Sequence, residues 1–247
     1  MILGLDPSLR AFGWTLIDEN LSIVDKGLFS TEADVIFVDR YIYLREQLRT
    51  LIQSCKEKTD HLQVGIESPI FNDLYSEGMY GLFLYSNEAL KLEKMDVVFL
   101  TPNQVKAHAH EFLGRPKGWK MQKADMVEAC KKANPHVKSI NHHQSDAYWV
   151  GRIASRFWDA MDGRVEIDAL SDLEKKHFTD VDLYIKGAKE GRVKRQGISH
   201  KEDDRWFRWS NKHQLDMRWR GYIAKVVGDH NGWRVIGLDG IVRSSLY

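Results

Sequence analysis

The sequence predicts an α/β protein in which a mixed five-stranded sheet is flanked by helices on both faces. Two observations predict the sheet: three short apolar segments open the chain as a meander, and two further apolar segments then alternate with helical patterns. A third observation, a change of composition after about residue 164, sets apart a smaller C-terminal part. We therefore expect one domain over residues 1–164 and an extension over residues 165–247.

The five expected strands are short apolar runs that are bounded by turn residues. They cover residues 1–5, 13–18, 21–30, 61–67 and 96–100. The sequence Asp18-Glu19-Asn20 suits a hairpin turn between the second and the third strand. Ser68-Pro69 is expected to end the fourth strand, and Thr101-Pro102 the fifth.

The expected helices show apolar residues that recur at spacings of three and four. They cover residues 35–58, 75–94, 122–133 and 144–161. In the first helix the apolar positions include Val38, Tyr41, Ile42, Leu48 and Ile52, and this spacing is typical of a helix. The resulting order of elements, β-β-β-α-β-α-β-α-α, predicts a mixed sheet with helices on both faces.

The composition excludes several classes of protein. No apolar run of about 18 residues is present, so no membrane span is expected. The first residues lack the pattern of a signal peptide. Cys55 and Cys130 have no metal-type spacing, so we expect both to be small core residues of a cytoplasmic protein.

The overall charge of +1 hides a strong asymmetry along the chain. Residues 1–100 carry 9 Lys or Arg against 16 Asp or Glu. The balance reverses later, with 10 against 6 in residues 101–163 and 12 against 5 in residues 186–225. Such polarity favours a polyanionic partner that the later segments meet, although solvated basic helix faces are the alternative.

Four residues from three elements form a candidate metal site. Asp6 ends the first strand and Glu67 ends the fourth, and a right-handed crossover places such strands side by side. His143 and Asp146 are three residues apart, so they share one face of the last helix. Three carboxylates and one imidazole suit two hard cations, which activate water in phosphodiester hydrolysis.

Each of these residues also has an ordinary structural interpretation. Asp6-Pro7-Ser8 is common turn chemistry, and Glu67 before Ser68-Pro69 suits a solvated strand end. A histidine and an aspartate in a first helical turn suit the helix dipole. What favours a site is the order of the four residues and their places at the ends of elements.

At this point the motifs resemble those of a known family. Four parts of the sequence resemble the four motifs of RuvC-type Holliday-junction resolvases. They are residues 2–14, Ile66-Glu67 with Phe71, residues 101–106 with 120–127, and residues 143–147. This family belongs to the ribonuclease H-like superfamily, and the resemblance covers about residues 1–160. Three departures are Ser8 in place of the usual Gly, Ile70 where an aromatic residue is usual, and residues 165–247, which have no counterpart.

The resemblance implies a site, cofactors and partners. Asp6, Glu67, His143 and Asp146 would be the catalytic residues that bind metal, and Lys106 and Lys120 would contact the phosphate and stabilise the transition state. Two Mg²⁺ ions are implied, with Mn²⁺ as a substitute. A homodimer, formed with the helix over residues 75–94, would nick four-way junctions or other branched DNA. If a phage encodes the chain, the location would be the host cytoplasm.

We therefore expect a crossover junction endodeoxyribonuclease. One alternative is a non-catalytic module of the same fold that binds branched DNA. The other is an actin-like enzyme that uses ATP, but this class needs a second phosphate-binding lobe and a longer chain.

The extension has its own signature. Basic residues interleave with Trp206, Trp209 and Trp219, a pattern typical of DNA contact through stacking and phosphate binding. We expect residues 165–247 to bind DNA or to support a dimer, with a small satellite core around the tryptophans as the alternative. Residues 222–227 and 233–238 are expected to form a β-hairpin around the turn at 228–232.

Overall fold

The computed structural model describes residues 1–68, 77–161, 164–166 and 169–179, together with the backbones of five later strands. The chain forms two compact units, residues 1–156 and residues 157–247, which are treated separately below. Among the described residues, no helix is both long and apolar enough to cross a membrane.

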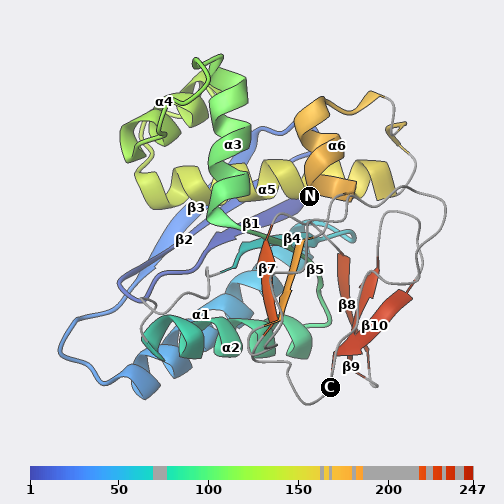
Figure 1. Cartoon of the computed structure of the whole chain (residues 1–247). Coiled ribbons are helices and arrows are strands. Elements are labelled where there is room, and N and C mark those ends of the chain that lie inside the picture. The colour runs from blue at the N-terminus through green and yellow to red at the C-terminus, as the bar shows by residue number, and fades with distance from the viewer. Residues whose placement is uncertain are drawn as a thin grey trace. The chain divides into compact units, whose positions relative to one another are not determined.

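The first unit contains the predicted mixed five-stranded sheet, in the order β5-β4-β1-β2-β3 (Figure 1). Its strands are β1 (Ile2–Asp6), β2 (Ala11–Ile17), β3 (Ile23–Ser30), β4 (Gln63–Glu67) and β5 (Asp96–Leu100). β1, β4 and β5 are parallel, whereas β2 runs antiparallel to both β1 and β3. The carboxyl ends of the three parallel strands therefore meet at one edge, where sites in α/β sheets usually form.

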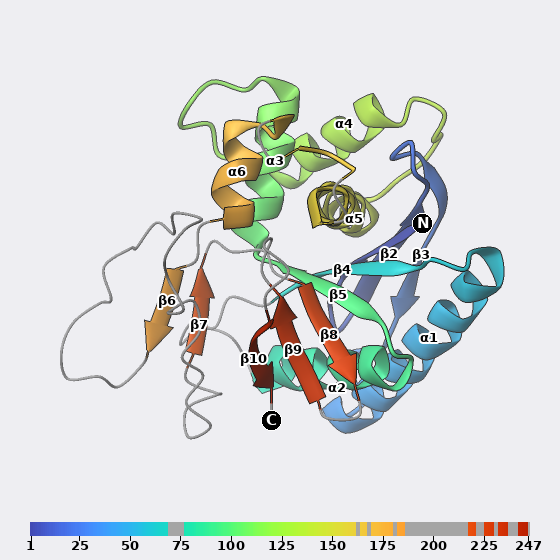
Figure 2. The same ribbon diagram turned by 90° about the vertical axis from the view of Figure 1, so that its right-hand side faces the viewer.

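Helices cover both faces of this sheet, as Figures 1 and 2 show. They are α1 (Phe37–Lys58), α2 (Glu77–Leu92), α3 (Pro102–Leu113), α4 (Lys123–Ala133) and α5 (His142–Met161). α1 and α2 pack together on one face, whereas α5 crosses the other and α3 pairs with α4. The predicted α/β architecture is thus confirmed.

α1 contributes only part of its apolar face to the core. Tyr41, Leu48 and Ile52 are buried. Val38 and Ile42, which share the apolar spacing, are 51% and 41% exposed. The reason is helical geometry: these two residues lie four apart on a separate stripe of α1, outside the face that contacts the sheet.

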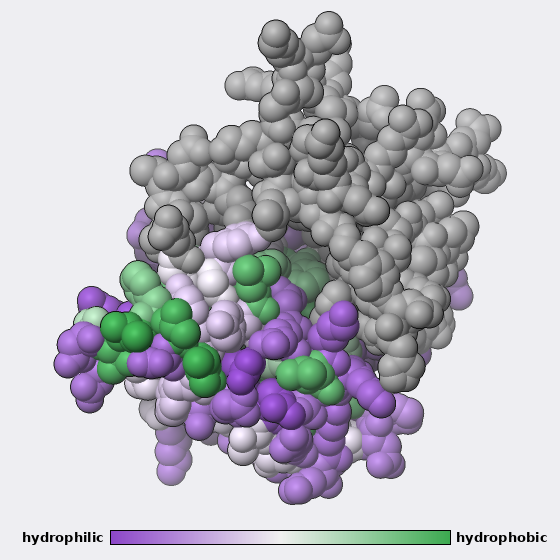
Figure 3. All heavy atoms as spheres, turned by 90° about the horizontal axis from the view of Figure 1, so that it is seen from below, coloured by the Kyte–Doolittle hydropathy of each residue, from purple (hydrophilic) through white to green (hydrophobic). Residues whose placement is uncertain are grey.

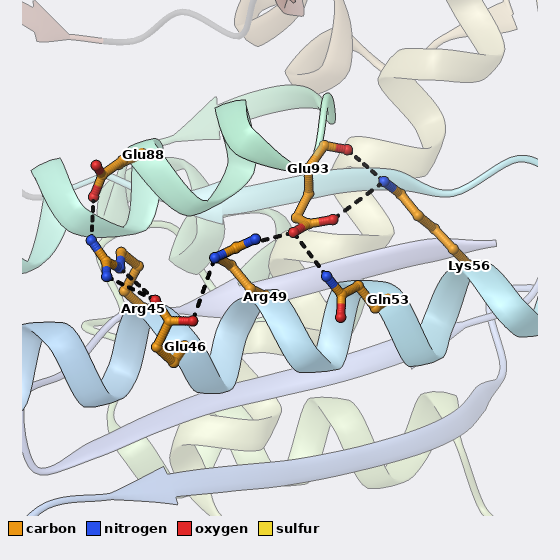
Figure 4. A network of polar contacts seen from close by, with 7 residues as sticks. All are labelled: Arg45, Glu46, Arg49, Gln53, Lys56, Glu88 and Glu93. Atoms are coloured by element: carbon orange, nitrogen blue, oxygen red, sulfur yellow. Dashed lines mark hydrogen bonds and ion pairs between the residues drawn. The ribbon is translucent and has the colours of Figure 1, made fainter.

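A polar network joins the end of α2 to α1 (Figure 4). Glu93, just after α2, is buried and accepts hydrogen bonds from Arg49 Nε at 3.0 Å and from Gln53 Nε2 at 3.1 Å. Earlier on α1, Arg45 donates a hydrogen bond to the carboxylate of Glu88 on α2 at 3.0 Å. Because a buried carboxylate is costly unless it is paired, this network fixes how α2 packs against α1.

α3 was not among the predicted helices. Thr101-Pro102 was interpreted only as a strand terminator, but it also begins this helix. Thr101 is the N-cap, its hydroxyl accepts the backbone N–H of Gln104, and the Gln104 side chain accepts the N–H of Thr101. Proline suits the first helical position because the N–H that it lacks has no partner there.

The second unit contains small antiparallel sheets. β8 (Lys225–Asp229), β9 (Gly232–Ile236) and β10 (Val242–Leu246) pair in sequence, which confirms the predicted hairpin and adds a third strand. β6 (Asp182–Ile185) pairs with β7 (Met217–Arg220), and α6 (Asp172–Thr179) precedes them. Trp206 and Trp209 lie outside the described residues, so their predicted DNA contacts stay a prediction.

α5 packs against its sheet at an unusually short distance because glycines line the contact. A Cβ on Gly4 of β1 would lie 2.0 Å from the carbonyl oxygen of Ala147, and one on Gly13 of β2 would lie 2.5 Å from that of His143. On β4, a Cβ at Gly65 would lie 2.7 Å from the side chain of Ala154. Three adjacent strands thus leave space for a helix whose N-terminal part carries two of the predicted site residues.

We expect Gly4→Ala to destabilise the protein strongly because its nearest obstacle is backbone, which must shift. Overpacking of this kind typically costs about 1–3 kcal/mol, and the present clash belongs at or above the upper end. The free energy of unfolding, measured with urea, checks this expectation.

Gly151→Ala on α5 is the matched control. Its Cβ would lie 3.3 Å from Gly4, and alanine favours a helix by about 1 kcal/mol over glycine. Near-neutral stability is expected for this variant. Equal losses in both variants would contradict the proposed importance of the Gly4 contact.

Candidate active site

Asp6 and Glu67 lie at the carboxyl ends of two neighbouring parallel strands. Leu5 of β1 pairs with Ile66 of β4, so the next residue of each strand is one of the two acids. Asp6 is 8% exposed, and its partner across the β1–β2 hairpin is Gly13. The fold therefore brings two residues that are 61 positions apart to one place at the sheet edge.

The start of α5 brings the other two predicted residues, His143 and Asp146, to the same place. Nδ1 of His143 lies 2.9 Å from Oδ2 of Asp6, within hydrogen-bond distance. Asn141 caps the helix, since its side chain accepts the N–H of Gln144 at 2.9 Å and its own N–H bonds the Gln144 side chain. This Asn-x-x-Gln capping signal places the start of α5 at His142, two residues before the predicted start.

The electrostatics show that the three carboxylates act on one another. Burial, followed by the charges of Asp6 and Asp146, raises the pKa of Glu67 well above its ordinary value. Burial and the charge of Asp6 raise the pKa of Asp146 to about 7, against the opposing effects of His143, Lys106 and Lys123. Near neutral pH the cluster therefore favours an added positive charge, as either a proton or a cation.

The donor chemistry of this cluster fits a hard divalent cation. Oδ1 of Asp146 is buried and has no hydrogen-bond partner in the described structure, and such an orphaned acceptor is unusual. Carboxylate oxygens are the ligands that Mg²⁺ and Mn²⁺ prefer. Within the described ranges, however, no three His, Cys, Asp or Glu side chains already stand in a metal-binding arrangement. A cation would have to draw these carboxylates closer together.

The predicted lysines differ in their relation to the acids. Lys106, on α3, is exposed, but its charge lowers the pKa of both Glu67 and Asp146. It therefore lies close enough to act on the acid cluster. Lys120 lies in the connection between α3 and α4 with an exposed side chain, and its carbonyl accepts a hydrogen bond from Gln122. Its predicted role at the phosphate stays a prediction.

Lys123, the first residue of α4, was not predicted as a site residue. Its charge acts on Asp146, and its Nζ lies 3.2 Å from Nε2 of His142. The neighbouring charges of His143 and Lys123 add to burial in lowering the pKa of His142. The sequence offered one signal, because Lys123 belongs to the basic run within residues 101–163, whose excess of Lys and Arg favoured a polyanionic partner.

Arg115 belongs to the same basic run but already has acidic partners. Its Nη2 bonds Oδ1 of Asp125 at 3.2 Å and also bonds Glu128. Its guanidinium is therefore committed to the α3–α4 pair, and the expected phosphate contact is not supported here. Ile70 and Phe71, at the expected position of a base-stacking aromatic, lie outside the described residues.

Comparisons with known proteins give a structural match only. No family model and no curated protein matches the sequence. Among solved structures, RuvC from Thermus thermophilus in complex with a Holliday junction substrate matches with a TM-score of 0.50 and 13% identity, over 66% of this chain and 95% of that chain. The fold is RuvC-like. A second structure of Thermus thermophilus RuvC matches with a TM-score of 0.48 and 13% identity, over 66% of this chain and 96% of that one.

The RuvC-like fold and the acid cluster together predict how stability depends on pH. Because the pKa of Asp146 rises from 3.8 to about 7 on folding, the folded chain retains a proton that the unfolded chain releases between these values. Stability must then fall as pH rises, by up to about 1.4 kcal/mol per pH unit. Glu67 shifts in the same direction and adds to the fall.

Urea unfolding with EDTA, from about pH 5 to about pH 8, measures this fall. We expect Asp146→Asn to make the slope shallower. Mg²⁺ is expected to restore stability at the alkaline end, because it replaces the lost proton. An unchanged slope in the variant would show that Asp146 does not retain the proton.

Proposed function

We propose that this protein is a metal-dependent, structure-selective endodeoxyribonuclease that nicks Holliday junctions or other branched DNA. The observation that carries the proposal is the convergence of Asp6, Glu67 and Asp146, whose charges act on one another at the end of the parallel strands. The fold supports it, because the Thermus thermophilus RuvC that it resembles was solved with a Holliday junction substrate.

The site residues have separable roles in this proposal. Asp6, Glu67, His143 and Asp146 would hold the metal ions, which when bound would supply an activated water and neutralise the scissile phosphate. The hydrogen bond from His143 fixes the orientation of the Asp6 carboxylate. Lys106 and Lys120 add positive charge for the DNA phosphate, and Lys123 contributes from the start of α4.

The surroundings of Asp6 keep its backbone in place. The carbonyl of Leu9, in the turn that follows β1, accepts a hydrogen bond from the buried Arg40 at 2.9 Å and another from Thr31. A turn that is anchored in this way holds the Asp6 carboxylate at the strand end before substrate binds. Such positioning of reacting groups is a large part of catalysis.

Asp6→Asn is the first test. We expect cleavage of a four-way junction to fall by at least about 100-fold, because an amide replaces a charged ligand, while junction binding stays within about threefold. The measurement compares cleavage with Mg²⁺ or Mn²⁺ and binding in EDTA. Asp25→Asn, at an exposed aspartate of β3, is the control and should cleave normally.

The outcomes separate the two functions. Full cleavage by Asp6→Asn would refute the assignment of the acid cluster. Binding without cleavage by the unmodified protein, with either metal, would favour the non-catalytic module. The lack of a ready-made metal arrangement in the described part is the observation that keeps this second function in view.

We also propose that the protein acts as a homodimer, since two symmetric nicks in a four-way junction suit a two-fold enzyme. The resemblance implied a dimer formed with α2, but the glycines of this helix face their own unit: a Cβ on Gly78 would meet Leu9 and Phe37, and one on Gly81 would meet Tyr41. The residues that support a dimer are apolar and exposed around the start of α1, on the face shown in Figure 3. They are Val35, Ile36, Phe37 and Val38.

Ile36→Glu tests the dimer. Ile36 is 66% exposed, so a charge there leaves the fold intact but is costly in an apolar interface. Sedimentation velocity is expected to show a dimer for the unmodified protein and a shift to monomer for the variant. Val24→Glu, at a 50% exposed residue of β3, should stay dimeric. A monomeric unmodified protein would refute the proposal.

A further inference from the structure

Trp119 is a large aromatic residue that the fold leaves open to solvent. It lies in the connection between α3 and α4, and it is 48% exposed. Most tryptophans bury their large apolar surface, so a half-exposed indole needs an explanation. The resemblance to the resolvase motifs assigned it no role.

The ring of Trp119 is held in one orientation. Its Nε1 donates a hydrogen bond to Oδ2 of Asp125 at 3.3 Å, and the guanidinium of Arg115 lies over the ring with its Cζ 5.3 Å from the centroid. Asp125 is itself fixed by the N–H of Gln122 at 2.8 Å. The backbone at Trp119 is held by a turn. Gly118 in this turn has φ +89°, and the Trp119 N–H donates a hydrogen bond to the Pro116 carbonyl.

This rigidity matters for binding. A side chain that is already ordered loses little conformational entropy when a ligand covers it. The only hydrogen-bond donor of the indole is occupied by Asp125, and Arg115 covers one face of the ring, so the ring offers the π-surface of its other face. The partner that fits such a surface is a flat aromatic group.

The charges around Trp119 identify the class of partner. Lys117 and Lys120 flank it with exposed side chains, and Lys123 follows at the start of α4. Lys123 also connects this region to the acid cluster, because its Nζ lies 3.2 Å from Nε2 of His142, the neighbour of the His143 that bonds Asp6. An aromatic surface between lysines that leads to a phosphodiester site suits a nucleic acid strand.

We propose that Trp119 stacks on an unpaired or unstacked base of branched DNA and so positions the strand beside the acid cluster. The proposal rests on the proposed function, because it takes the substrate to be branched DNA. In an intact duplex the base faces are covered by their neighbours, whereas at a branch point they are exposed. Stacking therefore selects DNA structure, and it tolerates any base because each has a π-face.

The test measures binding with cleavage silenced by EDTA. A four-way junction with 2-aminopurine at the branch point is titrated with the unmodified protein and with Trp119→Ala, Trp119→Leu and Trp119→Phe. We expect the alanine and leucine variants to bind about 5- to 150-fold more weakly, the range that corresponds to the loss of one stacked base. Trp119→Phe, which retains a ring, should stay within about fivefold of the unmodified protein.

Several controls keep the result specific. Tyr43→Leu, at a 45% exposed aromatic of α1, should leave the affinity unchanged. Affinity for an unbranched duplex of the same length should change by less than about twofold in all variants, because its bases are stacked. The 2-aminopurine fluorescence is a second readout, because it should change alike with the unmodified protein and with Trp119→Phe but differently with Trp119→Leu.

The outcomes are distinct. Equal junction affinity for the unmodified protein, Trp119→Ala and Trp119→Leu would overturn the proposal, as would 2-aminopurine fluorescence that is the same with the unmodified protein and with Trp119→Leu. A selective loss of junction binding by these two variants, in a protein that never cleaves, would support stacking while refuting the nuclease. Normal cleavage of the junction, with no loss of junction affinity in the Trp119 variants, would support the nuclease and refute stacking.

Discussion

The close packing of α5 against the sheet is the contact on which the site depends. His143 and Asp146 reach Asp6 only because Gly13 and Gly4 carry no side chain beneath the helix backbone. Gly13 is also the residue that pairs with Asp6 across the β1–β2 hairpin. The paired positions Asp6 and Gly13 therefore supply both the carboxylate and the space that lets His143 approach it.

This packing also creates an electrostatic cost. It brings Asp146 into a buried position beside other carboxylates, and its pKa rises to about 7 as a result. Such a cluster is unfavourable in isolation, so the rest of the unit must hold it together. The capped start of α5 and the anchored turn after β1 are two of the contacts that do so. A bound cation would relieve the repulsion and stabilise the fold.

Much of the fold was predictable because it depends on local patterns. Short apolar runs gave the five strands, and spacings of three and four gave α1, α2, α4 and α5. α3 was missed because Thr101-Pro102 both ends a strand and caps a helix, and these two roles share one local signal. The periodicity gave α1 itself but not the exposure of Val38 and Ile42, because apolar spacing does not distinguish a core stripe from an exposed one.

The site required long-range information that no local pattern carries. Asp6 and Glu67 were expected together because the topology of parallel strands dictates it. The contribution of Lys123 depends on how α4 lies relative to α5, and the availability of Arg115 depends on its ion pairs with Asp125 and Glu128. The lysine that acts on Asp146 and the aspartate that orients Trp119 both lie in the first turn of α4. The placement of that helix would therefore link the proposed stacking of a DNA base to the proposed chemistry at the phosphate.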